Sequence, residues 1–293
     1  MKENTKKNIT AWLFMLPYLV FFLGFLMFPI LRGFYLSFFN ARIGRMGDFI
    51  GLQNFVNILR DSSFWESLFN TLFFVVISTP TIAIMGFILA LIVNSKLKGT
   101  TFFRSAYFVS YVLSMAVVTG LWKFILQPYT GLLSSFTTAM GMGEIFMLST
   151  RWLAWVSVLI TTLWWTVGFV MVLFLAGLQD IPEELYEAAR IDGASSSQIL
   201  FQITIPMLRG VMIMIFMLQS IQSFKLFGQT WLMTLGGPGT HTRTIVHYIY
   251  QTGFIERQMG RASAMSILFL IVVLVFTLTQ GKLTSIGRNR GGE

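Results

Sequence analysis

Cysteine is absent from this chain of 293 residues, which excludes disulfides, thiolate metal sites and a cysteine nucleophile. Charged residues are also scarce, at 11% of the sequence, against roughly 25% in an ordinary soluble domain. Three motifs are missing: the G-x-x-x-x-G-K-[ST] phosphate loop, H-E-x-x-H and G-x-S-x-G. These absences disfavour a soluble protein, ATP hydrolysis through a phosphate loop, and the two enzyme classes that those motifs mark.

Apolar residues make up 55% of the chain, and a surface with so few charges needs lipid as its solvent. The formal charge of +9 could suggest nucleic acid, but the lysines and arginines are scattered singly between apolar runs and form no basic stripe. We therefore expect loops that face anionic lipid headgroups, and no nucleic-acid partner.

Six apolar runs are long enough to cross a hydrocarbon core about 30 Å thick as helices. None contains Asp or Glu, and none alternates as a barrel strand would. The run at 11–31 is too long for the apolar region of a signal peptide, so it predicts a retained anchor. The sequence thus predicts an all-α polytopic membrane protein with one membrane domain, 1–293, and spans at 11–31, 68–93, 105–127, 153–177, 209–233 and 263–280.

Lysines and arginines favour an N-terminus in the cytoplasm, with a small excess on that side. An even number of spans returns the C-terminus to the same side. The segment 178–208 then becomes a cytoplasmic loop, and ordered loops of this length are usually functional.

The loop 178–208 reads as two short helices separated by a glycine. Asp180 and Glu183 have the spacing of a capping box at the start of the first helix, and Gly193 would end it. Ser195 with Gln198 would start the second helix. From spacing alone, the first helix could equally be an amphipathic helix resting on the membrane.

Three features of this loop resemble the EAA loop of binding-protein-dependent ABC importer permeases. They are Glu-Ala-Ala at 187–189, Gly193, and Ile-Thr-Ile-Pro at 203–206, where the family has Leu instead of the second Ile. The resemblance implies the type I ABC importer permease fold. It also implies that the first short helix is the coupling helix, whose contact with a separate ATP-binding subunit would be made or shaped by Glu187, Ala188, Ala189 and Gly193.

Two further motifs resemble the first of two paired permeases in the carbohydrate-uptake branch, of the maltose and glycerol-phosphate type. They are Leu-Gly-Gly-Pro-Gly at 235–239 and Gly-Leu-Gln-Asn-Phe at 51–55. The resemblance implies a heterodimer with a second, homologous permease, two ATP-binding subunits, and an extracytoplasmic sugar-binding protein that delivers a carbohydrate. ATP and Mg²⁺ would belong to the ATP-binding partners, with no cofactor in this chain. It further implies the cytoplasmic membrane of a bacterium or archaeon.

Polar side chains inside the fourth and fifth spans suggest a substrate pathway. Gln219, Gln222 and Ser223 fall on one face of a helix, where amides and a hydroxyl could bind sugar hydroxyls. Alternatively, such groups only bond neighbouring helices. Alignment on the motifs with maltose-type permeases implies pathway positions at Trp165, Thr166, Phe169, Gln219, Gln222, Ser223 and Gly228. Most residue types differ from the maltose case, so maltose itself is not implied.

Lys225 adjoins that face and is costly in lipid, so it should face a cavity or extend outward. In a cavity it would favour an anionic group on the substrate. His241 and His247 have no carboxylate nearby and make a poor metal site, so we expect loop residues that face a substrate-delivering protein, with neither catalytic nor metal-ligating residues. An ion-coupled carrier, a channel and a membrane enzyme remain the alternative functions.

Overall fold

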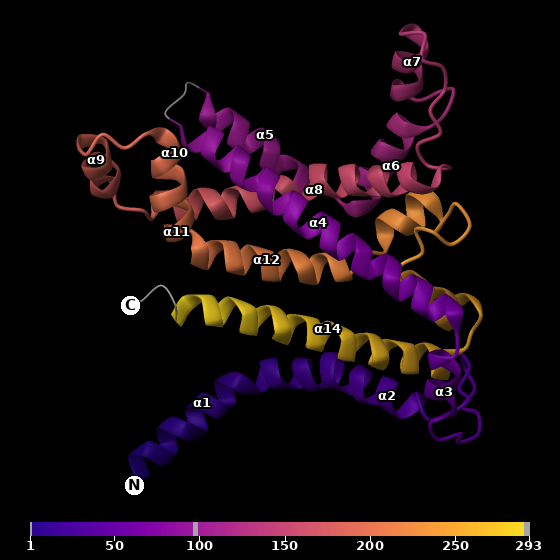
Figure 1. The fold of residues 1–293 in the computed structure, drawn as a ribbon. Coiled ribbons are helices and arrows are strands. Elements are labelled where there is room, and N and C mark those ends of the chain that lie inside the picture. Colours follow the sequence, from indigo (N-terminus) through magenta and orange to yellow (C-terminus); the bar gives the residue numbers. More distant parts are fainter. Residues whose placement is uncertain (1, 96–98, 290–293) are drawn as a thin grey trace. The chain divides into compact units, whose positions relative to one another are not determined.

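The computed structural model describes residues 2–95 and 99–289, with side chains for residues 12–95 and 99–282. Within these ranges every regular element is helical, and only two isolated β-bridges occur, Phe39 with Phe49 and Arg42 with Arg45. The predicted all-α class is confirmed (Figure 1).

The helices follow one another with few long connections (Figure 1), and η denotes a π-helix. Up to residue 139 they are α1 Lys2–Phe21, η1 Phe22–Met27, α2 Phe28–Leu36, α3 Gln53–Leu59, α4 Ser62–Asn94, α5 Thr100–Val112, α6 Met115–Leu126 and α7 Leu132–Ala139. After it they are α8 Arg151–Gln179, α9 Glu183–Ile191, α10 Ser196–Ile199, η2 Leu200–Thr204, α11 Ile205–Met207, α12 Arg209–Phe224, η3 Thr230–Thr234, α13 Ile245–Tyr250, η4 Gln251–Ile255 and α14 Met259–Asn289.

Several of these helices are long and apolar enough to cross a membrane. In the described part of the chain, four pass alone and two bent pairs pass together, which gives up to six crossings. The single helices are Trp12–Leu36, Ser62–Asn94, Arg151–Gln179 and Met259–Lys282, and the bent pairs are Thr100–Val112 with Met115–Leu126 and Ser196–Met207 with Arg209–Phe224.

Two predicted spans are broken in the structure. The third, 105–127, bends by 103° between α5 and α6, where Leu113 and Ser114 are extended and the Ser114 hydroxyl accepts a hydrogen bond from Val117 N. A serine that caps a new helix competes with continuation of the old one. The fifth, predicted to reach residue 233, ends as an α-helix at Phe224. Apolar runs count residues and do not detect such breaks.

Prolines inside the spans are accommodated, as the sequence predicts. Pro17 and Pro80 lie within α1 and α4 without ending them. The π-helices η1 and η2 each come just before a proline, Pro29 and Pro206. A wider turn is a common local adjustment where a helix loses a backbone donor.

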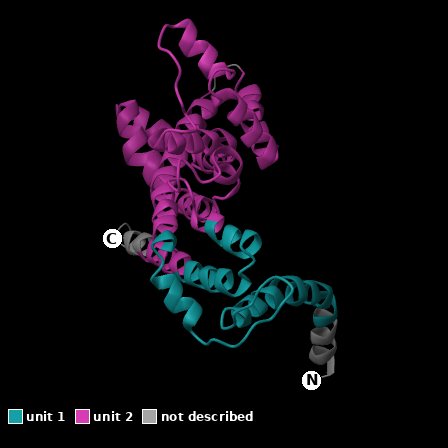
Figure 2. Ribbon diagram, turned by 90° about the vertical axis from the view of Figure 1, so that its right-hand side faces the viewer, with its two compact units in different colours: residues 1–64, 248–271 teal, residues 65–247, 272–293 magenta. Residues whose placement is uncertain are grey.

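The chain divides into two compact units, drawn in Figure 2. Unit 1 comprises residues 1–64 and 248–271, and unit 2 comprises residues 65–247 and 272–293. The single membrane domain expected for residues 1–293 stays a prediction.

In unit 1, the first loop is tied to helix ends through the Gly-Leu-Gln-Asn-Phe motif. The buried Asn54 of α3 donates hydrogen bonds to the carbonyls of Ser37, at 2.8 Å, and Phe39, at 3.0 Å. Asp61 forms an ion pair of 2.7 Å with Arg261 of α14 and accepts a hydrogen bond of 2.7 Å from the Tyr248 hydroxyl. These polar contacts hold residues far apart in the sequence in one cluster.

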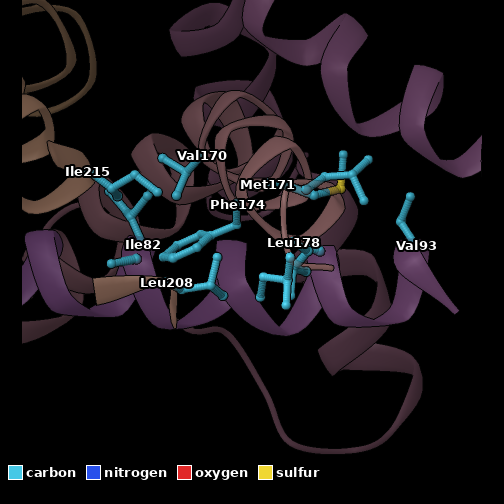
Figure 3. Close-up of a cluster of buried hydrophobic side chains, with 12 residues drawn as sticks. Ile82, Val93, Val170, Met171, Phe174, Leu178, Leu208 and Ile215 are labelled. Carbon is cyan, nitrogen blue, oxygen red and sulfur yellow. The ribbon is translucent and has the colours of Figure 1, made fainter. Parts of the chain in front are cut away.

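In unit 2, α4, α8 and α12 share an apolar core. Figure 3 shows side chains of the three helices gathered around Phe174, among them Ile82 of α4 and Ile215 of α12. Glycines let α8 approach its neighbours closely: a Cβ added to Gly168 would collide with the Tyr107 carbonyl of α5. Small residues at helix contacts are what drives close packing of membrane helices.

The loop between η3 and α13 is hydrogen-bonded to the beginning of α4. Asn70 donates to the carbonyls of Thr240 and Arg243, both at 3.1 Å, and the Thr240 hydroxyl donates to Glu66 at 2.7 Å. Thr71 accepts a hydrogen bond of 2.8 Å from Ile245 N. The loop is thereby fixed to the second span.

His247 is not the loop residue that the sequence suggested. It belongs to α13, is 2% exposed, and lies edge-on to Trp231 and Phe227, with ring centroids 4.9 and 6.0 Å away. Burial first, and the positive charge of Arg243 second, lower the pKa of this imidazole from 6.5 to about 4. His247 is therefore neutral at pH 7 and part of the protein interior.

Replacing Gly168 by alanine should destabilise the protein by about 1–3 kcal/mol, because the new methyl group must displace α5. Gly120 of α6 has open space around it, so alanine there should be neutral or stabilising. Denaturant unfolding of the purified protein in detergent measures both. Equal stability of the two variants would contradict the close contact.

Stability should fall as the pH drops from 6.5 toward 4, because unfolded His247 takes up a proton that the folded residue refuses. Above pH 6.5 this contribution is fully present. The unfolding temperature of His247→Gln should therefore vary less with pH than that of the wild type. A pH dependence of His247→Gln equal to that of the wild type would contradict a buried, neutral imidazole.

Candidate functional site

The short helix α9 begins differently from the prediction. Its first residue is Glu183, its N-cap is Pro182, and no side chain caps it. Asp180, expected in a capping box, instead forms the C-cap of α8. The prolyl residue fixes an extended N-cap without a side-chain acceptor, so the spacing of two acids was misleading here.

The second predicted cap is confirmed. The Ser195 hydroxyl accepts a hydrogen bond from Gln198 N, and the Gln198 side chain accepts one from Ser195 N at 2.8 Å. This reciprocal pair begins α10. The chain between α9 and α10 is consequently short and ordered at both ends.

Gly193 ends α9 as the sequence predicts. Its φ is +79°, in the left-handed region that residues with a Cβ rarely adopt. Ala194 N bonds to the Ala189 carbonyl at 2.9 Å, and Gly193 N to the Arg190 carbonyl at 3.1 Å. This pair of bonds is the Schellman arrangement, which turns the chain sharply and leaves α9 projecting.

One face of α9 is held by unit 2 and the other is exposed. Tyr186 packs against the apolar core, and its hydroxyl lies 3.3 Å from the Thr204 hydroxyl. On the other side Ile191 is 86% exposed and Leu185 is 41% exposed. The predicted contact residues Glu187, Ala188 and Gly193 are exposed, and Ala189 is half-buried. Figure 1 shows α9 and α7 at opposite ends of α8.

A cavity of about 580 Å³ lies between α8 and α12 in unit 2. It brings together most of the predicted pathway residues: Trp165, Thr166 and Phe169 from α8, and Gln219, Gln222 and Ser223 from α12. Lys225, the C-cap of α12, also lines it. Among the described residues that line this cavity, Lys225 is the sole charged one.

The polar groups of this cavity differ in their availability. The Thr166 hydroxyl donates to the Thr162 carbonyl at 2.7 Å, and Ser223 bonds the Ser78 hydroxyl of α4 at 2.8 Å. The amides of Gln219 and Gln222 make no hydrogen bond within the described part of the chain. Two amides are thus free to bind a polar ligand.

Aromatic rings form part of the same wall. Phe169 stacks on Tyr111 of α5, with centroids 4.7 Å apart and planes 12° apart. The Trp165 indole donates to the Leu113 carbonyl, at the break between α5 and α6, at 3.1 Å. The break therefore has one of its free carbonyls satisfied by a cavity residue.

Gly228 does not line this cavity. A Cβ added to it would collide with the Met115 side chain, which does line the wall. The glycine lets Met115 of α6 pack against the chain after α12. The structure therefore does not bring this predicted pathway residue to the cavity, and Gly228 can affect the wall only through Met115.

Other elements also form the wall of this cavity, and the sequence did not predict their contribution. Five lining residues come from α4, from both sides of the α5–α6 break, and from the chain after α12: Phe74, Tyr111, Met115, Leu226 and Gln229. Thr162 of α8 and Leu218 of α12 complete the lining. Ser114 was the available signal, because a serine that can cap a helix marked the bend that brings Tyr111 and Met115 to the cavity.

Comparison with known proteins agrees with this architecture. The family profile described as "Binding-protein-dependent transport system inner membrane component" matches residues 46–284. The probable ABC transporter permease protein YurN of Bacillus subtilis is 35% identical, with 97% of this chain and 98% of that protein covered. The trehalose/maltose transport system permease protein MalF of Thermococcus litoralis is 32% identical over 96% and 94%.

A solved structure has the same fold. A chain of a bacterial ABC transporter involved in the import of the acidic polysaccharide alginate superposes with a TM-score of 0.87 at 24% identity, and 97% of each chain is covered. At this identity the likeness shows the fold alone, and it confirms the predicted type I importer permease fold. With the profile spanning most of the sequence, the chain belongs to the family of binding-protein-dependent transport system inner membrane components.

Proposed function

We propose that this chain is the membrane-spanning permease subunit of an ATP-driven importer for a sugar or oligosaccharide, which a solute-binding protein delivers. Membership of the family supports the transport role, and the family is a membrane component rather than an enzyme. Two similar proteins support a carbohydrate substrate: the trehalose/maltose transport system permease of Thermococcus litoralis and the alginate importer.

The chemistry of the 580 Å³ cavity carries the proposal for this chain's own residues. The free amides of Gln219 and Gln222 can both donate and accept hydrogen bonds, which matches the hydroxyl groups of a sugar. The faces of Phe169 and Trp165 offer apolar area to sugar rings. An anionic group on the substrate, expected from Lys225, stays a prediction.

We assign α9 as the coupling helix that docks on a separate ATP-binding subunit. Its exposed Leu185 and Ile191 leave apolar area without a partner in the described chain, and Ala188 lets another surface approach closely. Gly193 sets the angle of the helix. ATP and Mg²⁺ would be held by two such subunits, and this chain would contribute no ligand to them.

The complete importer would contain a second, homologous permease beside this one, in the lipid of a bacterial or archaeal cytoplasmic membrane. The N- and C-termini and α9 would face the cytoplasm, and α7 the other side. The places of α9 and α7 at opposite ends of α8 support opposite sides for these two helices. Closure of the ATP-binding subunits would then move α9 and open the cavity toward the binding protein.

Replacing Gly193 by valine should abolish uptake and substrate-stimulated ATP hydrolysis. A left-handed conformation costs about 1–2 kcal/mol for a residue with a Cβ, and a β-branched side chain pays more. The Schellman turn would rearrange and α9 would lose its angle. Membrane insertion should persist, as quantified by immunoblotting of membranes.

The matched control is Ser196→Val, an exposed position in the same loop without a left-handed backbone. It should support normal uptake in proteoliposomes that contain the complete importer. Full uptake by Gly193→Val would rule out a coupling role for the turn.

Replacing Gln222 by leucine should raise the KM of uptake about tenfold, the equivalent of one hydrogen bond in a desolvated site. Assembly should be unchanged because the amide has no partner in the described chain. Gln127→Leu, at an exposed residue outside the cavity, is the control. Unchanged uptake kinetics of the Gln222 variant would remove this residue from the pathway.

A further inference from the structure

We propose that unit 1 contains a binding site for the phosphate headgroup of an anionic phospholipid, formed by Arg32, Arg42 and Arg45. This site is separate from the sugar pathway and does not depend on it. Three observations support the proposal: the geometry of a hairpin, the residues that line a cavity, and the position of the site along the first spanning helix, at the membrane interface.

The hairpin places two like charges side by side. Arg42 N donates to the Arg45 carbonyl at 2.9 Å, and Arg45 N donates to the Arg42 carbonyl at 3.1 Å. Gly44, with φ +76°, completes the two-residue turn between them. Residues that exchange both bonds have side chains on the same face, about 5.5 Å apart at their α-carbons, and like charges so placed are destabilising. An anion between them removes that cost.

The hairpin forms one wall of a cavity of about 730 Å³. Arg32 of α2 reaches the same cavity, and no acid is among its described lining residues. The three guanidinium groups make no ion pair or side-chain hydrogen bond in the described part of unit 1. Asp48 is two residues from the lining residue Met46, and Glu256 is two residues from the lining residue Phe254, but neither acid lines the cavity. The lining of the cavity is therefore positively charged, and no acidic side chain among the described lining residues neutralises it.

The rest of the lining is mainly apolar and comes largely from spanning helices. It includes Pro29 and Leu36 of α2, Phe254 and Met259. A free anion has no use for such a wall, whereas the glycerol and upper acyl carbons of a phospholipid can pack against it. Phosphate next to apolar surface is the chemistry of a lipid headgroup.

The height of the site agrees with this ligand. Arg32 comes 21 residues after Ala11, where the first apolar run of the sequence begins, and this is about 30 Å of helix, one hydrocarbon thickness. In the most apolar stretch of this span, no described residue is buried against the rest of the protein. Exposed Phe34 and Tyr35 adjoin Arg32, as aromatic residues do at a membrane interface. The guanidinium groups thus lie where lipid phosphates lie.

Lipid retention by the purified, complete importer tests the site. The importer is loaded with phosphatidylglycerol or phosphatidylcholine, passed through detergent, and its bound lipid is counted by native mass spectrometry. The wild type should retain phosphatidylglycerol at least about tenfold better than Arg42→Gln/Arg45→Gln, in line with the loss of charge-assisted hydrogen bonds. Phosphatidylcholine should be retained poorly by both.

The matched control is Arg60→Gln/Arg151→Gln, which removes the same charge from exposed arginines outside the cavity and should retain lipid like the wild type. If the hairpin variant does not assemble, Arg32→Gln, in a helix, provides the same comparison. Equal retention by variant and wild type would overturn the proposal. Displacement of the lipid by 10 mM inorganic phosphate would also overturn it, because the site would then bind free anions. A third contrary result is a hairpin variant that retains lipid normally and loses only affinity for the solute-binding protein.

Discussion

Backbone groups in a hydrocarbon core must find partners inside the protein, and this constraint organises unit 2. A helix can be interrupted at membrane depth only where protein or a water-filled cavity covers the break. Two of the breaks in the described helices, the one between α5 and α6 and the one after α12, contribute to the wall of the same cavity. The indole of Trp165 bonds the carbonyl of Leu113 at the first of them. The breaks in the helices thus form part of the wall of the polar cavity, and a residue of this cavity satisfies a backbone group at the first break.

The surface helix α9 follows from a different constraint. Its apolar residues on one side join the core through Tyr186, while Leu185 and Ile191 face outward. Apolar side chains that are exposed together on one surface mark a contact with protein or membrane. The left-handed Gly193 fixes the helix without adding bulk. A fixed base and an exposed apolar surface suit the contact with an ATP-binding subunit that we propose for α9.

Much of the fold and part of the candidate site could be predicted from the sequence, because the informative signals are local. Apolar runs located the crossings, Ser195 with Gln198 located a cap, and Gly193 located a turn. The errors concern tertiary context. The α5–α6 bend and the end of α12 lie inside segments that are apolar enough on average to be predicted as continuous spans. Burial of His247 depends on Trp231 and Phe227. The role of Gly228 likewise depends on Met115, a residue far away in the sequence.

Asn70 illustrates how one amide can unite distant parts of such a chain. It holds the carbonyls of Thr240 and Arg243, on either side of the turn that follows the Gly-Gly-Pro segment. Since both bonds must break before that turn can leave α4, a tilt of this span carries the loop along as a rigid attachment. A movement of α4 that begins at one end of unit 2 would therefore reach this loop, because both hydrogen bonds attach the loop to α4.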